Sequence, residues 1–196
     1  METMIEHPII KGLYYFPNIL FEKEDLDLIK SLDEKKWTSV GGKNSRVVQQ
    51  YGYNYDYKIK SANTKNKAES MPIEIENLGK KLEEICKKIG IIDDKYKFDQ
   101  CIVNNYQPGQ GISKHIDSKQ FGRVIGCYSI GGTVQMKFIK GKEIVDVTIE
   151  KGSLYIMSGD ARYKWMHELP SRLFDEINLK KKERERRISI TFRNMN

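Results

Sequence analysis

A histidine and an aspartate two positions apart form the first candidate site in this chain. His115 and Asp117 end the segment 104–117, and on a strand both side chains would leave the same face of the sheet. The chain has three histidines, so a second nitrogen ligand would come from His7 or His167, unless a second carboxylate takes its place. We favour His167, because it lies beside a strand-like run, whereas His7 lies in a polar N-terminal stretch. Two histidines and a carboxylate that leave open positions are the ligands of non-haem Fe(II) oxygenases.

A row of hydrogen-bond donors on the C-terminal segment 187–193 could bind a dicarboxylate. The segment alternates, so a strand would place Ile188, Ile190 and Phe192 on one face and Arg187, Ser189, Thr191 and Arg193 on the other. Guanidinium groups pair with carboxylates through two parallel hydrogen bonds. A solvated face is the plainer interpretation of two isolated arginines. Asn104 and Tyr106 share a face of an earlier segment, and they would complete a site for an organic acid if these strands line one barrel.

Four tyrosines alternate along residues 51–57, and a strand there would place all four rings on one face. Arg46, Gln49 and Gln50 precede them in the sequence. Such a row could stack on bases and hydrogen-bond to their edges, as in proteins that bind single strands. The alternative is a β-hairpin whose tyrosines cover the core.

Two helices followed by many short strands predict a fold that is mainly β with some α. The apolar spacing of Leu26, Ile29 and Leu32 predicts an amphipathic helix over 23–35, and a longer stripe predicts another over 72–89. Strands are predicted over 101–106, 112–117, 124–130, 153–157 and 187–193, with a hairpin over 134–149. This order indicates a sandwich or jelly roll with an N-terminal α/β extension and helices packed on one outer face. For the polar segment 171–186 we expect a solvent loop, with phosphate contact as the alternative.

Length and composition indicate one globular domain. The chain has 196 residues, of which 39% are hydrophobic and 31% charged. No apolar run reaches the roughly 20 residues that a membrane span needs, and the N-terminus lacks a signal-peptide pattern, so we expect an intracellular protein of the cytoplasm or nucleus. Three widely spaced cysteines without a CxxC motif indicate neither a disulfide framework nor a zinc site. A net charge of +7 fits either a polyanionic partner or a merely solvated basic surface.

Taken together, these motifs resemble the AlkB-type Fe(II)/2-oxoglutarate-dependent dioxygenases. The likeness runs from about Arg46 to Arg193 and is carried by the segments 104–117, 152–167 and 187–193. It implies a double-stranded β-helix forming a single domain over 1–196. Within that domain, 1–97 would be an N-terminal extension with helices and a nucleotide-recognition lid, and 98–196 the β-helix catalytic core.

The resemblance also implies the cofactors and their ligands. Iron would be held by His115, Asp117 and His167. The cosubstrate 2-oxoglutarate would be held by Asn104, Tyr106, Arg187, Ser189 and Arg193. In this family O₂ and 2-oxoglutarate are consumed together, and a substrate C–H bond is hydroxylated; on an N-methyl carbon this step releases formaldehyde.

The leading functional hypothesis is oxidative demethylation of N-alkylated bases in DNA or RNA. Lys119 stands where DNA-repair members of the family carry an acidic residue, and a cation suits a positively charged alkylated base poorly. The segments 49–53 and 159–163 instead look similar to members that hydroxylate a modified wobble uridine in transfer RNA, which is the alternative. The expected substrate contacts are Arg46, Gln50, Tyr51, Tyr53, Lys119 and Arg162.

Two further alternatives keep the fold and change the activity. One is an oxygenase of protein side chains, and the other is a non-catalytic jelly roll that binds nucleic acid. Binding by the latter would weaken steeply with salt and be indifferent to iron and 2-oxoglutarate. We expect a monomer whose partner is nucleic acid, DNA or RNA including transfer RNA, with no membrane and no disulfide partner.

Overall fold

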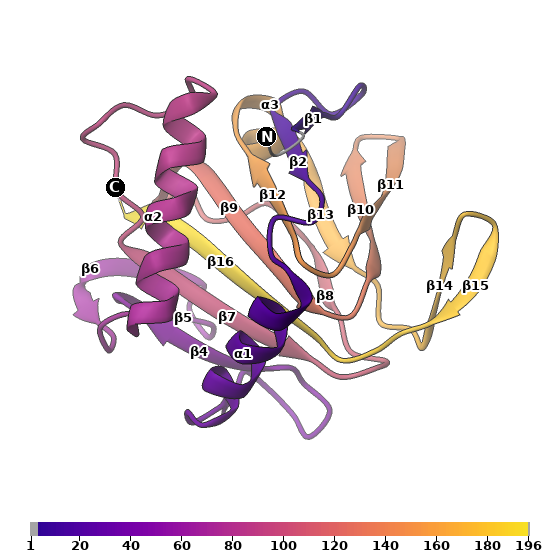
Figure 1. Cartoon of the computed structure of the whole chain (residues 1–196), viewed down its shortest axis with the longest axis horizontal. Coiled ribbons are helices and arrows are strands. Elements are labelled where there is room, and N and C mark those ends of the chain that lie inside the picture. The colour runs from indigo at the N-terminus through magenta and orange to yellow at the C-terminus, as the bar shows by residue number, and fades with distance from the viewer. Residues whose placement is uncertain (1–3, 196) are drawn as a thin grey trace.

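The computed structural model describes residues 4–195 as two antiparallel sheets packed face to face, with the two longer helices on one outer face (Figure 1). The large sheet has the strand order β1-β2-β12-β9-β16-β7-β4-β3, and the small sheet has the order β11-β10-β13-β8. Two hairpins, β5-β6 and β14-β15, stand apart from these sheets. This architecture confirms the predicted jelly roll, mainly β with some α.

The large sheet consists of β1 (Ile5–Glu6), β2 (Leu13–Phe16), β3 (Thr38–Ser39), β4 (Val47–Tyr51), β7 (Gln100–Tyr106), β9 (Phe121–Gly131), β12 (Ser153–Met157) and β16 (Arg187–Met195). The small sheet consists of β8 (Ile112–His115), β10 (Val134–Lys140), β11 (Glu143–Ile149) and β13 (Met166–Leu169). The hairpins are β5 (Tyr53–Asp56) with β6 (Ser61–Lys67), and β14 (Phe174–Ile177) with β15 (Lys180–Glu183). The helices are α1 (Glu22–Asp33), α2 (Ile73–Lys88) and α3 (Gly159–Tyr163).

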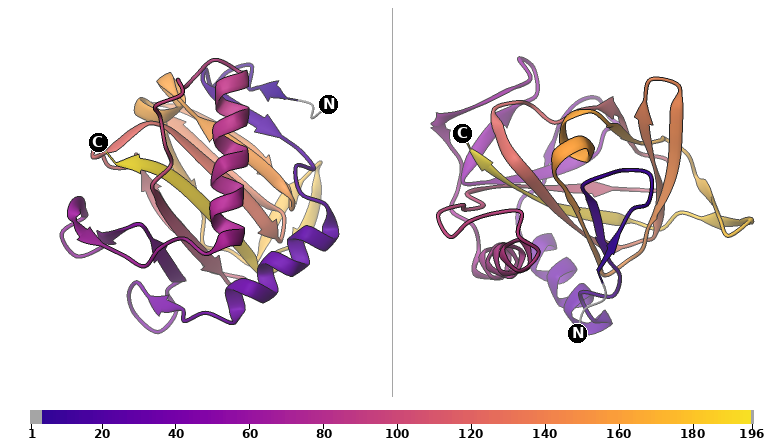
Figure 2. Two further views of the ribbon diagram at one scale, coloured as in Figure 1. Left: turned by 60° about the vertical axis from the view of Figure 1, so that its left-hand side comes forward. Right: turned by 90° about the horizontal axis from the view of Figure 1, so that it is seen from above.

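Strand alternation divides the interior into two hydrophobic cores. Apolar residues of β16 and β7, including Ile190 and Val103, pack with α1 and α2 on the outer face of the large sheet (Figure 2). On the inner face, Cys127, Tyr155 and Phe138 belong to a core between the two sheets. Because successive side chains of a strand point to opposite faces, the polar residues of β16 point between the sheets. The predicted two-faced character of segment 187–193 is therefore confirmed.

Two details of the predicted elements are wrong. In α1 the buried face is formed by Asp25, Leu28 and Leu32, while Leu26 is 59% exposed. The buried Asp25 carboxylate accepts a hydrogen bond from the Gly131 amide at 3.1 Å, so a polar residue that apolar spacing does not count belongs to the packed face. Segment 171–186 is not a loop: it contains the β14–β15 hairpin, which projects from the body (Figure 1).

The tyrosine row is interrupted, so the four rings do not share a face. Gly52 separates β4 from β5 with φ +76°, and a Cβ there would lie 1.9 Å from the Asp99 carbonyl oxygen. Glycine adopts this positive φ without steric cost. The alternation of side chains between the two faces of the strand is therefore broken at Gly52. Tyr51 consequently packs in the core beneath the helices, where its hydroxyl donates to Gln49 Oε1 at 3.0 Å.

The remaining three tyrosines lie on the hairpin side of the break. Tyr53 and Tyr55 pack against Ala62 and Phe121. The Tyr57 ring meets the Tyr55 ring edge-on, with the centroids 5.1 Å apart. Within residues 4–195, none of the helices has the length and apolar character to cross a membrane.

Candidate metal and cosubstrate site

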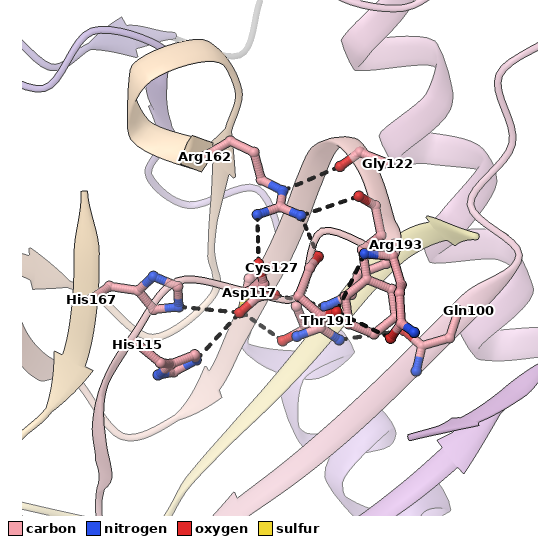
Figure 3. Close-up of polar contacts among 12 residues, drawn as sticks. Gln100, His115, Asp117, Gly122, Cys127, Arg162, His167, Thr191 and Arg193 are labelled. Atoms are coloured by element: carbon pink, nitrogen blue, oxygen red, sulfur yellow. Dashed lines mark hydrogen bonds and ion pairs between the residues drawn. The ribbon is translucent and has the colours of Figure 1, made fainter. Parts of the chain in front are cut away.

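The triad is assembled by two neighbouring strands of the small sheet. His115 is the last residue of β8 and lies directly opposite His167 of β13 in the strand register. The sequence predicts a continuous strand over 112–117, but β8 ends at His115. Asp117 therefore reaches the two histidines from the turn that follows the strand. Asp117 Oδ1 lies 3.3 Å from His115 Nε2 and 3.6 Å from His167 Nε2 (Figure 3). Each residue thus offers a ligand atom within 4.8 Å of the others.

The protonation states suit metal binding. Burial and the nearby His115 lower the pKa of His167 to about 4, so its ring is neutral at pH 7. Burial alone would raise the pKa of Asp117, but the Arg193 guanidinium and the two histidines hold it well below its usual range. Arg193 Nε donates to Asp117 Oδ2 at 2.8 Å and leaves Oδ1 facing the histidines. A neutral imidazole and an ionised carboxylate are the forms that bind a divalent metal.

A backbone carbonyl of the same strand fixes the orientation of the His115 ring. Its Nδ1 lies 2.8 Å from the Ser113 carbonyl oxygen, which can only accept a hydrogen bond. The Nδ1–H tautomer follows, and Nε2 keeps its lone pair for the metal.

The large sheet supplies donors for an organic acid beside the triad. A small inner cavity is lined by five of these side chains, namely Asn104, Tyr106, Arg187, Ser189 and Arg193. Arg187 is buried, its Nε donates to Ser129 Oγ at 2.9 Å, and its Nη2 has no partner among the described residues. A buried donor without an acceptor is costly, so an anionic group is expected to complete it. The residues therefore fit 2-oxoglutarate, because one of its carboxylates would accept hydrogen bonds from Arg187.

A larger cavity of about 520 Å³ opens over the triad. His115, Asp117 and Arg193 lie in its wall. Aromatic and basic side chains complete the lining, namely Tyr55, Tyr57, Phe121, Arg46, Lys60 and Lys114. Tyr55, Tyr57 and Lys60 come from the β5–β6 hairpin and its turn, so this hairpin forms a lid over the cavity.

Arg46 and Gln50 connect this lid to the body. Arg46 lines the cavity, donates from Nε to Asn104 Oδ1 at 2.8 Å, and places its guanidinium 5.6 Å from the Tyr57 ring centroid. Gln50 is committed to the lid backbone: its Oε1 accepts from the Tyr55 amide at 2.6 Å, and its Nε2 donates to the Tyr55 carbonyl at 3.3 Å. Gln50 therefore shapes the lid and has little capacity left to bind a base edge.

Several expected substrate contacts lie elsewhere. Tyr51 is in the core beneath the helices, and Tyr53, at the start of the lid strand β5, packs against Ala62 and Phe121 outside the cavity wall. Lys119 is exposed on the turn after Asp117. Arg162 is buried, and its guanidinium donates to backbone carbonyls below the cavity (Figure 3). Burial corrects the expectation that Tyr51 and Arg162 touch a substrate.

The sequence patterns did not single out Lys60, Lys114 and Phe121 as lining residues. Tyr55 and Tyr57 entered the prediction only as members of the tyrosine row. The glycine at position 52 was the available signal, because a glycine inside an alternating pattern indicates a break in the strand.

Comparison with known proteins agrees with this geometry. The model of the 2OG-Fe(II) oxygenase superfamily matches residues 12–193. Protein L905 of Acanthamoeba polyphaga mimivirus is 50% identical over 109 residues, covering 54% of this chain and 51% of L905. The mouse tRNA (carboxymethyluridine(34)-5-O)-methyltransferase ALKBH8 is 31% identical over 175 residues, covering 85% of this chain and 25% of ALKBH8. This chain thus spans about half the length of one relative and a quarter of the other.

A solved structure shows the same fold at low identity. OsALKBH1 superposes with a TM-score of 0.64 at 18% identity, over 93% of this chain and 96% of that one. The three residues that could hold iron, two of them buried, and the row of donors beside them are the features that this fold would use. The chain belongs to the 2OG-Fe(II) oxygenase superfamily, whose members use Fe(II), 2-oxoglutarate and O₂, and within it the chain is similar to proteins of the AlkB type.

Proposed function

We propose that this chain hydroxylates a modified base in RNA whose substituent is neutral or negatively charged, as on a wobble uridine of transfer RNA. The charge of the cavity over the triad carries this proposal. Arg46, Lys60 and Lys114 line it, and Arg193 lies at its base. The one carboxylate in the lining, Asp117, is a metal ligand already paired with Arg193.

The charge of this cavity favours hydroxylation of a modified uridine over demethylation of a cationic alkylated base. A cationic alkylated base would enter among several fixed positive charges, where repulsion is stronger than in water because the dielectric constant is lower. A carboxymethyl group is an anion and would be attracted by the same side chains. ALKBH8 of mouse is named for a carboxymethyluridine of transfer RNA, which supports extending this substrate class to the present chain.

Oxidative demethylation of a neutral N-methylated base in DNA or RNA is the second candidate. Tyr55, Tyr57 and Phe121 favour it, because an aromatic wall stacks on the face of any base. These rings select for a base but not for its substituent. The two candidates therefore differ only in the reacting group placed near the triad.

The test is a competition among RNA oligonucleotides that differ in one base. The full chain with Fe(II), 2-oxoglutarate and ascorbate is given 5-carboxymethyluridine, N6-methyladenine or the cationic 1-methyladenine, and the nucleosides are analysed by mass spectrometry. We expect carboxymethyluridine to gain one oxygen atom, with 1-methyladenine the poorest substrate. The His115→Ala variant is the control for oxidation that does not need the site.

Each other outcome has a defined meaning. Formaldehyde release from N6-methyladenine, without oxidation of carboxymethyluridine, would favour the second candidate. Preferred turnover of 1-methyladenine would contradict the electrostatic argument altogether.

A further inference from the structure

A buried arginine lies beneath the metal site without touching it. Arg162 belongs to the short helix α3, is 2% exposed, and points toward the turn that follows β8 (Figure 3). Its guanidinium donates to four backbone carbonyls of that turn: Asp117 at 2.9 Å, Ser118 at 2.7 Å, Phe121 at 3.1 Å and Gly122 at 3.2 Å. The side chain therefore closes the turn 117–122 around a single planar group.

This turn carries two functional side chains and little regular structure. It connects β8 to β9, and the hydrogen bond from the Phe121 amide to the Ser118 carbonyl is 3.2 Å long. At its first residue is the metal ligand Asp117. At Phe121, its fifth, the ring faces the cavity with its centroid 6.0 Å from that of Tyr55 and 4.8 Å from the Arg193 guanidinium carbon. One guanidinium thus holds both a metal ligand and part of the substrate wall.

The helix that presents Arg162 is itself anchored. The Ala161 amide donates to the Lys11 carbonyl at 2.9 Å, and the Ser158 amide donates to the Gly12 carbonyl at 2.8 Å. These bonds tie the N-terminal side of the helix to the segment that precedes β2. Because α3 is held in place by these bonds, the Arg162 guanidinium holds the turn 117–122 in a fixed position relative to α3.

We propose that Arg162 is a positioning residue that sets the metal affinity of the site by holding the backbone of Asp117. The rigid fork of arginine can serve several carbonyls at once, whereas lysine is a point charge with one nitrogen. Removing the guanidinium would also leave buried carbonyls without their donor and so lower the stability of the fold. The metal affinity is therefore measured beside thermal unfolding, so that the two effects are separated.

Arg184 provides a matched control within the same chain. It is also buried, at 4% exposure, and donates to both oxygens of Asp175 and to the Pro170 carbonyl. These contacts fix the base of the β14–β15 hairpin rather than the turn of the metal ligand. Replacing Arg184 therefore removes a guanidinium that is about as buried as that of Arg162 but lies away from the triad.

The experiment measures Mn(II) affinity of the full chain by electron paramagnetic resonance, with thermal unfolding of each variant recorded in parallel. Groups that orient metal ligands typically cost about 10- to 100-fold in affinity when lost. We expect Arg162→Met to weaken Mn(II) binding by about tenfold or more, and Arg162→Lys by a smaller factor of about three to ten. Arg184→Met should lower the melting temperature while Mn(II) affinity stays within about twofold of wild type.

Three results would overturn the proposal. Wild-type Mn(II) affinity in Arg162→Met would show that the turn holds Asp117 without the guanidinium. Equal losses in Arg162→Met and Arg184→Met would assign the effect to general loosening. Should Arg162→Met fail to fold, Arg162→Lys decides alone, because wild-type affinity in that variant would contradict a need for the fork.

Discussion

The two halves of the cavity are built differently. In the half that would hold iron and 2-oxoglutarate, every proposed ligand residue except Asp117 comes from a strand of the two sheets. Among these strands, β16 is paired along its length with β7 on one side and β9 on the other. The half that faces the substrate is the β5–β6 hairpin, whose strands pair with each other at the periphery of the fold (Figure 2). Polar contacts such as those of Gln50 and Gln120 attach this lid to the body.

This difference separates two tasks. Donors on paired, buried strands lose little freedom when they bind, so the cofactor half is preorganised. A lid attached by a few hydrogen bonds can move and change without disturbing the metal ligands. Changes in the sheet half should therefore abolish chemistry, whereas changes in the lid should alter substrate affinity and selection.

The largest effect is expected from a metal ligand. His115→Ala removes one of three ligand atoms, and its side chain is part-exposed, so the fold should remain. Turnover of 2-oxoglutarate should fall by at least about a hundredfold, since even outer groups cost 10- to 100-fold. The assay is release of labelled CO₂. His7→Ala, which removes a histidine whose Nδ1 accepts from the Ile10 amide, should keep wild-type turnover.

A smaller effect is expected from the cosubstrate half of the sheet. Arg187→Met removes the buried guanidinium whose Nη2 has no partner within residues 4–195. A hydrogen bond to a charged group contributes about 1.5–3 kcal/mol, which is roughly 10- to 100-fold in the KM for 2-oxoglutarate. The neighbouring Arg186→Met is the control, because Arg186 pairs with Asp33 on the outer face. An unchanged KM in Arg187→Met would refute the cosubstrate assignment.

A still smaller and different effect is expected from the lid. Gln50→Leu removes both hydrogen bonds to the Tyr55 backbone and should shift the aromatic wall. Two net hydrogen bonds of about 1 kcal/mol each predict a roughly 10-fold or larger rise in the KM for RNA. CO₂ release without RNA should stay near wild type. Loss of both activities would mean that lid and sheet are not independent.

The smallest effect is expected from a single lid charge. Lys60→Ala removes one cation from the cavity lining, whereas Lys65→Ala removes one from exposed β6. Each phosphate contact contributes about 0.7 to the slope of log affinity against log salt for a single strand. We expect binding to carboxymethyluridine RNA to lose more affinity in Lys60→Ala than in Lys65→Ala. Equal losses would indicate general attraction rather than contact with the modified base.

The sheet half was the more predictable from sequence. Alternation over 187–193 identified the inward donors because both neighbours of β16 are regular strands. The lid half was mispredicted because a single residue, Gly52, divides the tyrosine row between two environments. Arg162 was expected to contact the substrate, and its inward direction depends on the path of the turn 117–122, which no local pattern specifies.

The most direct test of this account is CO₂ release from labelled 2-oxoglutarate with Fe(II) and no RNA. It compares wild type, His115→Ala and Gln50→Leu in one assay. The account predicts slow release by wild type, a similar rate for Gln50→Leu, and none above background for His115→Ala. Absence of release by wild type, or release retained in His115→Ala, would contradict a site held by the sheets.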